Sequence, residues 1–393
     1  MLKNRVTLID SLRGFSLFGI LMANLLIFQF SLWGKDIINT DELSQMDLVS
    51  LRFIQVAFEY SFLPIFSLLF GYSLVKLAES IKQKRNKSRW HLVRRAIGLM
   101  TIGSLHATYI WDGDILMYYG GMLFLLLPFL HRKPKTLLIW SGISFVLFTA
   151  ASYGDVSEMF KTPDMLAFVE MTDEVHANGT YQEILDYREN AMPPIFDIDP
   201  LLAVSALLLS PFYMLPMFLI GMAMAKQRWF SNPSQQTNIY RHGWWLLAIG
   251  LTLKLLAHLE GWEAFTGIFA QSGGQLLAIG YVFVFAHLYA RNQQSFLFTI
   301  LESMGKLSLT NYLMQSVIMT FIFYGYGLGY YQQISIVASI FIGILVYVAQ
   351  CLCSVLYLKY AKRGPVEYLL RMWTNLSWRG KVKEANSSYI KSA

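Results

Sequence analysis

The sequence predicts an all-α, polytopic integral membrane protein of about ten transmembrane helices, with both ends of the chain in the cytoplasm. Of its 393 residues, 55% are hydrophobic and only 15% are charged, whereas soluble chains carry roughly 25% charged residues. Apolar stretches of about 20 residues, which is the length that crosses a hydrocarbon layer of roughly 30 Å, alternate with polar connectors. Basic and acidic connectors also alternate along the chain.

Ten apolar stretches are the expected transmembrane spans, and each is bounded by polar or turn-forming residues. In chain order they cover residues 12 to 33, 51 to 78, 96 to 112, 115 to 130, 135 to 152, 201 to 225, 243 to 260, 271 to 290, 308 to 330 and 333 to 358. Tight turns are expected near 112 to 114 and 329 to 332.

The charges of the connectors set the expected orientation. Lys and Arg gather in the N-terminal segment, in 82 to 95, in 131 to 135, in 226 to 241 and in the tail from Lys359. The connectors between them, 36 to 47 and 153 to 200, are acidic. Because basic connectors stay on the cytoplasmic side, this pattern places both ends of the chain in the cytoplasm.

The expected organisation is one membrane domain over 1 to 363, followed by a cytoplasmic tail over 364 to 393. The 153 to 200 connector is too long for a turn, so we expect it to hold one or two helices at the outer surface. The net charge of +7 does not indicate nucleic-acid binding, because the basic residues lie in short connectors. Membrane lipid surrounds such a domain, and a homodimer is possible.

Ionisable residues inside spans are candidates for function, because charge is costly in lipid. Asp10 and Arg13 share one helix face at the start of the first span, as an ion pair or as a phosphate-binding site. Glu59 has apolar neighbours, so it either pairs with a basic residue such as Arg52 or becomes protonated.

His106 is the strongest candidate for catalysis. It lies near the outer end of the third span, and Asp112 and Asp114 follow within two turns. A carboxylate can fix the tautomer of a histidine and leave its second ring nitrogen free to take a proton. A histidine on a helix can also be a packing residue.

Two further polar patterns fall within spans. Lys254 and His258 are four residues apart, and Lys254 could extend toward the membrane surface. In the ninth span Ser308, Asn311 and Gln315 form a polar helix face that either bonds neighbouring helices or lines a cavity. Asn24 in the first span could serve in the same way.

Several motifs together resemble the YeiB-like family of bacterial multi-pass proteins of unknown function, and this resemblance implies a location in the bacterial cytoplasmic (inner) membrane. The motifs are Ile9-Asp-Ser-Leu-Arg-Gly14 with its continuation to Asn24, Phe66-Ser-Leu-Leu-Phe-Gly71, Arg94-Arg95, Leu105-His106, Gly113-Asp-Ile-Leu116, Leu309-Thr-Asn-Tyr312 and Gly364-Pro-Val-Glu-Tyr-Leu-Leu-Arg371. The Asp-x-x-Arg-Gly opening at Asp10, Arg13 and Gly14 is also similar to that of transmembrane acyltransferases such as heparan-alpha-glucosaminide N-acetyltransferase.

The more distant resemblance implies transfer of an acyl group from cytoplasmic acyl-CoA to an acceptor hydroxyl or amine on the extracytoplasmic side of the membrane. Acetyl is the leading candidate for the acyl group. Acyl-CoA is then a co-substrate, and no tightly bound cofactor or metal is expected. Arg13, Arg94 and Arg95, with Asp10 beside them, would hold the CoA phosphates. His106 would act as the base, with Asp114 orienting it.

Two alternatives stay open. Some YeiB-like proteins have been described as transport-related, and a small-molecule transporter would use Glu59, Arg52, Lys254 and His258 as a polar path. A scaffold or assembly factor would use the 153 to 200 connector as its contact surface.

Overall fold

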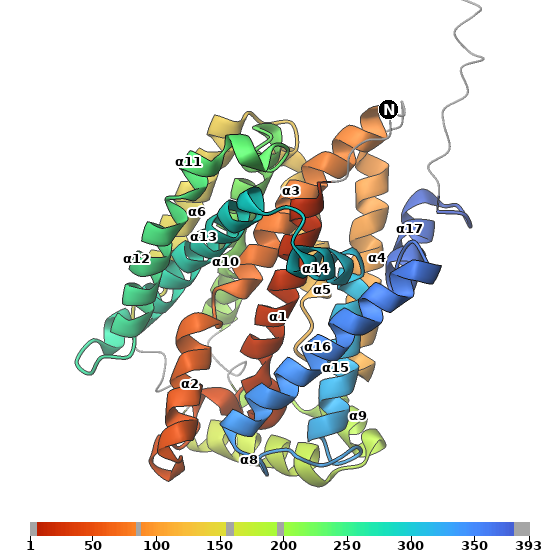
Figure 1. Cartoon of the computed structure of the whole chain (residues 1–393). Coiled ribbons are helices and arrows are strands. Elements are labelled where there is room, and N and C mark those ends of the chain that lie inside the picture. The colour runs from red at the N-terminus through yellow and green to blue at the C-terminus, as the bar shows by residue number, and fades with distance from the viewer. Residues whose placement is uncertain (1–5, 84–87, 155–160, 195–199, 381–393) are drawn as a thin grey trace, which may run out of the picture.

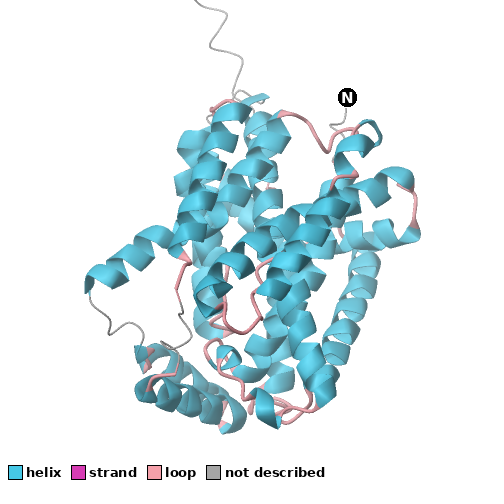
Figure 2. Ribbon diagram, turned by 90° about the vertical axis from the view of Figure 1, so that its left-hand side faces the viewer, coloured by secondary structure: helices cyan, strands magenta, loops and turns pink. Residues whose placement is uncertain are grey.

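The computed structural model describes residues 6–83, 88–154, 161–194 and 200–380. Every regular element in these ranges is a helix, and they contain no strand, as Figure 2 shows. The expected all-α fold is therefore confirmed. The basic residues Lys84, Arg85 and Lys87, parts of the 153 to 200 connector (155–160 and 195–199) and the tail beyond 380 lie outside the described residues.

The first part of the chain includes α4, the helix that carries the candidate catalytic histidine. They are α1 (Thr7–Phe30), η1 (Gly34–Asp36), η2 (Thr40–Glu42), α2 (Gln45–Ala57), α3 (Phe62–Gln83), α4 (Ser88–Tyr109), α5 (Leu116–Leu126), η3 (Leu127–Phe129) and α6 (Pro134–Ala151).

The second part begins with two short helices and returns to long ones. They are α8 (Pro163–Asn178), α9 (Tyr181–Asn190), α10 (Pro200–Lys226), η5 (Pro233–Gln235), α11 (Thr237–Tyr240), α12 (Gly243–Leu256), η6 (Glu263–Phe265), α13 (Thr266–Arg291), α14 (Phe296–Lys306), α15 (Ser308–Phe323), α16 (Ile336–Tyr360) and α17 (Pro365–Asn375).

Within the described ranges, five helical stretches are long and apolar enough to cross a membrane. They are Thr7–Phe30, Gln45–Gln83, Pro134–Ala151, Glu263–Arg291 and Ile336–Tyr360. The chain therefore has the length and composition of a multi-pass membrane protein. The count of ten spans and the cytoplasmic location of both ends remain predictions.

The bundle has two ends, and Figure 1 shows which elements lie at each. The N-terminus and α17 lie at one end, here called the basic end, where α3 finishes in Gln83 and α10 in Lys226. The α8–α9 hairpin lies at the opposite end, here called the hairpin end. α1 packs against α3, α14, α15 and α16 along the middle of the bundle.

The predicted span 51 to 78 is two helices rather than one. α2 ends at Ala57 and α3 starts at Phe62, and between them Tyr60 has a φ of 57°, which is left-handed backbone. The 39 residues from Gln45 to Gln83 exceed the length that one helix needs to cross a bilayer, and a helix break is tolerated in a membrane domain where neighbouring protein bonds the freed carbonyl groups. Here the Lys254 ammonium donates a 2.6 Å hydrogen bond to the carbonyl oxygen of Glu59.

The predicted span 308 to 330 is also shorter than expected. α15 ends at Phe323, and a tight loop follows in which the Gly325 amide donates to the carbonyl of His176 on α8. The expected helices of the 153 to 200 connector are present as α8 and α9. The loop after α15 therefore ties the hairpin to the bundle.

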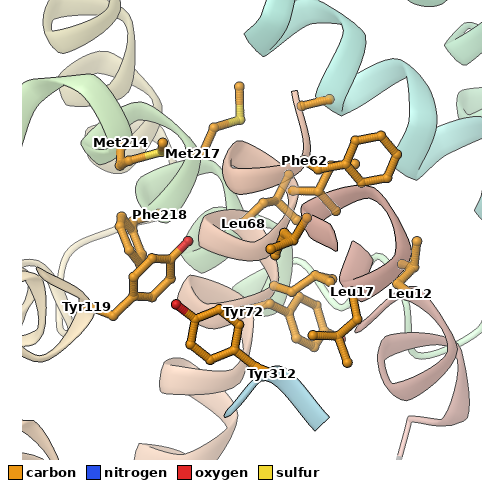
Figure 3. Packing of buried hydrophobic residues seen from close by; sticks show 14 of the residues in the cluster. Leu12, Leu17, Phe62, Leu68, Tyr72, Tyr119, Met214, Met217, Phe218 and Tyr312 are labelled. Carbon is orange, nitrogen blue, oxygen red and sulfur yellow. The ribbon is translucent and has the colours of Figure 1, made fainter. Parts of the chain in front are cut away.

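The core of the bundle is apolar and rich in aromatic side chains. Figure 3 shows part of it, where Tyr119 and Phe218 meet with ring centroids 5.2 Å apart. The Tyr119 hydroxyl bonds Ser67 at 2.7 Å, so this buried polar group is satisfied within the core.

Candidate functional site

His106 and Asp114 form a buried hydrogen-bonded pair between α4 and α5. The distance from His106 Nδ1 to Asp114 Oδ2 is 2.7 Å, and the two side chains are only 1% and 2% exposed. The second carboxylate oxygen, Oδ1, accepts a 2.8 Å hydrogen bond from the Met117 amide in the first turn of α5. Both oxygens of Asp114 are therefore held, and the carboxylate fixes the histidine ring.

The local sequence permits this geometry through a small residue and a large one. A Cβ atom on Gly103 would lie 2.3 Å from the Met117 amide nitrogen and 2.6 Å from Asp114 Oδ1. Only glycine therefore allows α4 to approach the start of α5 so closely. Trp111 is fully buried and stacks on Phe28 at 4.2 Å between ring centroids, which anchors the turn between the two helices.

The second ring nitrogen of His106 is available for chemistry. Nε2 is buried and has no hydrogen-bond partner among the described residues. Because a carboxylate can only accept, Nδ1 is the donor in the pair, and Nε2 carries the lone pair of the neutral ring. The Tyr312 ring lies 5.4 Å from the imidazole, and its hydroxyl accepts a 3.3 Å hydrogen bond from the Ile115 amide.

A cavity approaches this pair from the basic end. This central cavity has a volume of about 320 Å³. Its wall includes Ile115, the residue after Asp114, and Tyr312, whose ring lies 5.4 Å from the imidazole, whereas His106 and Asp114 are not among its lining residues. Arg13, Arg95 and Lys306 also line it, and much of the remaining wall is apolar, with Phe66, Leu69, Phe70, Leu74 and Leu99.

A second cavity of about 660 Å³ opens at the basic end and is here called the entrance cavity. It shares Arg13, Arg95, Lys306 and Glu367 with the central cavity, so the two adjoin at this point. Its wall adds four cationic or acidic side chains from α3 and from the C-terminal region: Lys76, Glu79, Arg363 and Arg371. The shared wall has three cationic side chains and one carboxylate, and Lys306 also pairs with Glu302 at 2.7 Å. The junction of the cavities is here called the cationic junction, and its excess of cationic side chains suits phosphate groups.

The glycine of the Asp-x-x-Arg-Gly motif has a packing role at this junction. A Cβ atom on Gly14 would lie 2.0 Å from the Leu301 carbonyl oxygen, and one on Gly305 would lie 1.8 Å from the Asp10 carbonyl oxygen. α1 and α14 thus touch through two glycines, and Lys306 is placed at the same cavity wall as Arg13. Arg13 also bonds Asp10 at 3.1 Å and donates to Ser73 of α3.

The predicted phosphate-binding residues do not all lie together. Asp10 lines the entrance cavity, and Arg13 and Arg95 line both cavities. Arg94 is instead directed toward α17, where its Nε donates to the Thr374 carbonyl at 2.9 Å. Consecutive residues on a helix point about 100° apart, so only one of two adjacent arginines faces the cavity.

The polar face of α15 is divided between a cavity and helix packing. Ser308 lines the central cavity. Asn311 donates to Ser354 at 2.9 Å, and Gln315 donates to Gln350 at 3.1 Å, so both amides join α15 to α16. Asn24 is half-buried on α1.

Glu59 belongs to a separate charged cluster near the hairpin end. It pairs with Lys35 at 3.5 Å rather than with Arg52, whose guanidinium contacts His258 at 2.9 Å. Lys254 is 2% exposed, so it does not extend to the surface as the sequence suggested. Burial alone would lower the pKa of Lys35, but the negative charges of Glu59 and Asp36 outweigh it and raise that pKa above its ordinary value.

A third cavity, of about 790 Å³, lies under the hairpin and is here called the hairpin cavity. Ala107, Thr108 and Tyr109, the three residues that follow His106, form part of its wall, together with Asp112. The residues that follow His106 on α4 therefore reach the hairpin cavity, whereas His106 itself is not among its lining residues.

Comparisons with known proteins give the family. The family described as "Protein of unknown function (DUF418)" matches residues 224–377. Uncharacterized protein YxaH of Bacillus subtilis (strain 168) is 30% identical over 394 residues, covering 97% of both chains. Uncharacterized protein YeiB of Escherichia coli (strain K12) is 27% identical over 395 residues, covering 95% of this chain and 97% of YeiB.

The chain belongs to the YeiB-like family. The resemblance inferred from the motifs is thus confirmed. A third relative is the "Uncharacterized 39.9 kDa protein in amylase 3'region" of Bacillus acidopullulyticus, which is 25% identical over 374 residues, covering 95% of this chain and 94% of the relative. No solved structure matches the chain significantly. The names of these YeiB-like relatives state no activity.

Sequence reasoning missed three residues of the site in this YeiB-like chain. Lys306 lines the cationic junction, Tyr312 lies beside His106, and Glu367 accepts hydrogen bonds from the amides of Leu309 and Thr310 at 2.7 and 3.1 Å. Tyr312 and Glu367 both fall within the motifs that carried the family resemblance. Lys306 could not be placed from the sequence, because its position depends on the α1–α14 contact.

Proposed function

We propose that this protein is a transmembrane acyltransferase whose acyl donor is acyl-CoA, with acetyl as the leading candidate for the acyl group. It takes the acyl group from acyl-CoA at the basic end and passes it to an acceptor at the hairpin end. The observation that carries the proposal is that one cavity adjoins both a cationic group and the buried histidine. The wall of the central cavity includes Arg13, Arg95 and Lys306, and it also includes Ile115 and Tyr312, which adjoin the His106–Asp114 pair.

The cationic junction supports binding of the CoA phosphates. Arg13, Arg95 and Lys306 line it together, and guanidinium groups bind phosphate oxygens with paired hydrogen bonds. The entrance cavity offers the larger space that the nucleotide part of CoA needs. The narrower central cavity, with its apolar wall, suits the acyl-pantetheine arm, and its far end brings a thioester to Tyr312 and Ile115.

The chemistry is a general-base transfer. The acceptor gives its O–H or N–H proton to Nε2 of His106, and its oxygen or nitrogen bonds to the thioester carbonyl carbon. The carbon–sulfur bond then breaks, and the CoA sulfur leaves and takes the proton back from His106 as a thiol. Asp114 keeps Nδ1 protonated and stabilises the imidazolium. The Tyr312 hydroxyl accepts from Ile115, so its own hydrogen is available for the carbonyl oxygen.

Binding of acetyl-CoA to the purified protein in nanodiscs tests the donor half of this proposal. We expect saturable binding that CoA competes for. Arg95→Gln and Lys306→Gln should each weaken it by on the order of 10- to 100-fold, since a hydrogen bond to a charged group contributes about 1.5–3 kcal/mol. Arg241→Gln, an exposed arginine outside these cavities, is the control. Absence of saturable binding, or equal binding by the Arg95 and Lys306 variants, contradicts the proposal.

A second candidate, transport of a small molecule, is supported by the cluster of Lys35, Glu59 and Lys254. These charged groups gather where the α2–α3 break frees the Glu59 carbonyl, an arrangement typical of ion and substrate paths. Flux in proteoliposomes that needs no acyl donor and is lost in Glu59→Gln would favour transport. Flux that is absent, or unchanged by Glu59→Gln, would remove it.

A further inference from the structure

The hairpin cavity contains buried polar groups that the fold does not use. Both ring nitrogens of His176, which is 2% exposed, have no hydrogen-bond partner among the described residues. The same is true of Nε and Nη2 of Arg188, whose Nη1 donates to the Ile110 carbonyl at 3.1 Å. Both side chains line the cavity. Because burying polar groups without partners costs free energy, such groups indicate a binding site.

The two free atoms of Arg188 lie on one edge of its guanidinium. Nε and Nη2 point the same way and make the paired hydrogen bonds by which arginine holds a carboxylate or phosphate. The guanidinium carbon lies 5.8 Å from the centre of the Tyr324 ring, and His176 stacks on that ring at 4.4 Å. Arg188 and His176 are therefore held in place by one aromatic side chain at the wall of the cavity.

The cavity also carries an excess of negative charge. Asp112, Asp186 and Glu189 line it and are exposed, whereas Arg188 is half-buried. An anion alone would be attracted by the arginine and repelled by these carboxylates. A ligand with both an anionic group and an ammonium group matches both charges, because its ammonium can face the carboxylates.

We propose that the hairpin cavity binds a small zwitterionic molecule, with its carboxylate or phosphate on the Nε–Nη2 edge of Arg188 and its amine toward Asp112. Asp112 lies between His106 and Asp114 along the chain, so the amine would stand on the side of the cavity nearest the histidine. The role of this molecule as the acyl acceptor rests on the proposed function, whereas its binding to the cavity does not.

Four matched sugars test the binding on the full chain in nanodiscs. Glucosamine 6-phosphate carries both charges, glucose 6-phosphate only the negative one, glucosamine only the positive one, and glucose neither. Alanine and alaninamide are compared in the same way, and they differ in the carboxylate. This comparison shows whether the anionic group of the ligand is a carboxylate rather than a phosphate. We expect a saturable rise in Tm with glucosamine 6-phosphate or alanine that exceeds the rise with the matched compounds lacking one charge.

Two variants tie the effect to the site. Arg188→Lys keeps the positive charge but loses the paired donors of the guanidinium. It should therefore weaken binding of the zwitterion roughly tenfold or more. Asp112→Asn changes an exposed side chain that folding tolerates, and it should weaken glucosamine 6-phosphate but not glucose 6-phosphate. If neither zwitterion raises the Tm more than its matched compounds, or if both variants bind as the wild type does, the inference is wrong. Acetyl-CoA binding is measured on the same samples and tests the proposed function independently. Failure of this inference can therefore be distinguished from failure of the proposed function.

Discussion

Asp114 is the residue on which the geometry of the histidine depends. It accepts one hydrogen bond from His106 at 2.7 Å and one from the Met117 amide at 2.8 Å. The second bond fixes the carboxylate to the start of α5, so the imidazole cannot turn without breaking its own hydrogen bond to Asp114. The chemistry and the local fold thus use the same side chain.

Asp114→Asn should separate these two uses. The asparagine oxygen can still accept from Met117, but its amide group offers hydrogens to His106 Nδ1, which moves the ring proton to Nε2. We expect acyl transfer to fall by on the order of 10²- to 10⁴-fold with unchanged acetyl-CoA binding. Asp164→Asn, on an exposed carboxylate of α8, is the control. Full transfer activity in Asp114→Asn would remove the pair from the mechanism.

His176 predicts a pH dependence of stability. Burial lowers the pKa of His176 to about 4; Asp112 opposes this shift and Arg188 adds to it. The unfolded chain, with a histidine pKa near 6.5, binds the proton more readily, so this residue's contribution is complete above about pH 6.5 and is lost as the pH falls toward 4. The full loss is about 3 kcal/mol.

The measurement is the Tm of wild type and His176→Phe between pH 7 and pH 4. Phenylalanine can stack on Tyr324 but cannot take up a proton, so the variant should lose less stability than wild type over this range. Parallel pH curves for the two proteins would show that His176 does not titrate as the structure requires.

At the scale of elements, α17 caps the start of α15 beside the central and entrance cavities. Glu367 on α17 accepts from the amides of Leu309 and Thr310 and from the Thr310 hydroxyl at 2.6 Å. It also lines both the central and the entrance cavity. The helix after the last predicted span is therefore joined to the candidate site.

Glu367→Gln tests this cap. Loss of the charge at the N-terminus of α15 should lower the free energy of unfolding by about 0.5–2 kcal/mol. The measurement is the Tm of Glu367→Gln. The control is Glu260→Gln, which changes an exposed glutamate without such a role. An unchanged Tm in Glu367→Gln would mean that α17 is held by its other contacts alone.

The elements also show what the sequence could and could not predict. Apolar length predicted most helices, because each stretch must pair its own backbone groups in lipid. The α2–α3 break was missed, since residues 51 to 78 are continuously apolar apart from a few polar side chains. His106 and Asp114 were found because they lie eight residues apart in one chain segment. Lys306 and Glu367 join the site only through contacts between distant helices, which no local pattern contains.

At the scale of the whole molecule, the separation of charge predicts one orientation. Glu183 lies on α9 at the hairpin end and Arg228 follows α10 at the basic end, and both are exposed. In a background with Cys351 and Cys353 replaced by serine, Glu183→Cys should react with a membrane-impermeant maleimide on intact cells. Arg228→Cys should react only after lysis. The reverse labelling would invert the proposed direction of transfer.

The most direct test of the account follows an acetyl group across the bundle. Sealed vesicles with the basic end outward receive acetyl-CoA labelled on the acetyl carbon, and the label on material inside is measured for wild type, His106→Gln and the control Arg241→Gln. We predict labelled product inside with wild type and the control, and almost none with His106→Gln, while all three bind acetyl-CoA equally. Equal labelling by His106→Gln, or no labelling by wild type in vesicles that hold the cell's own envelope material, would contradict the account.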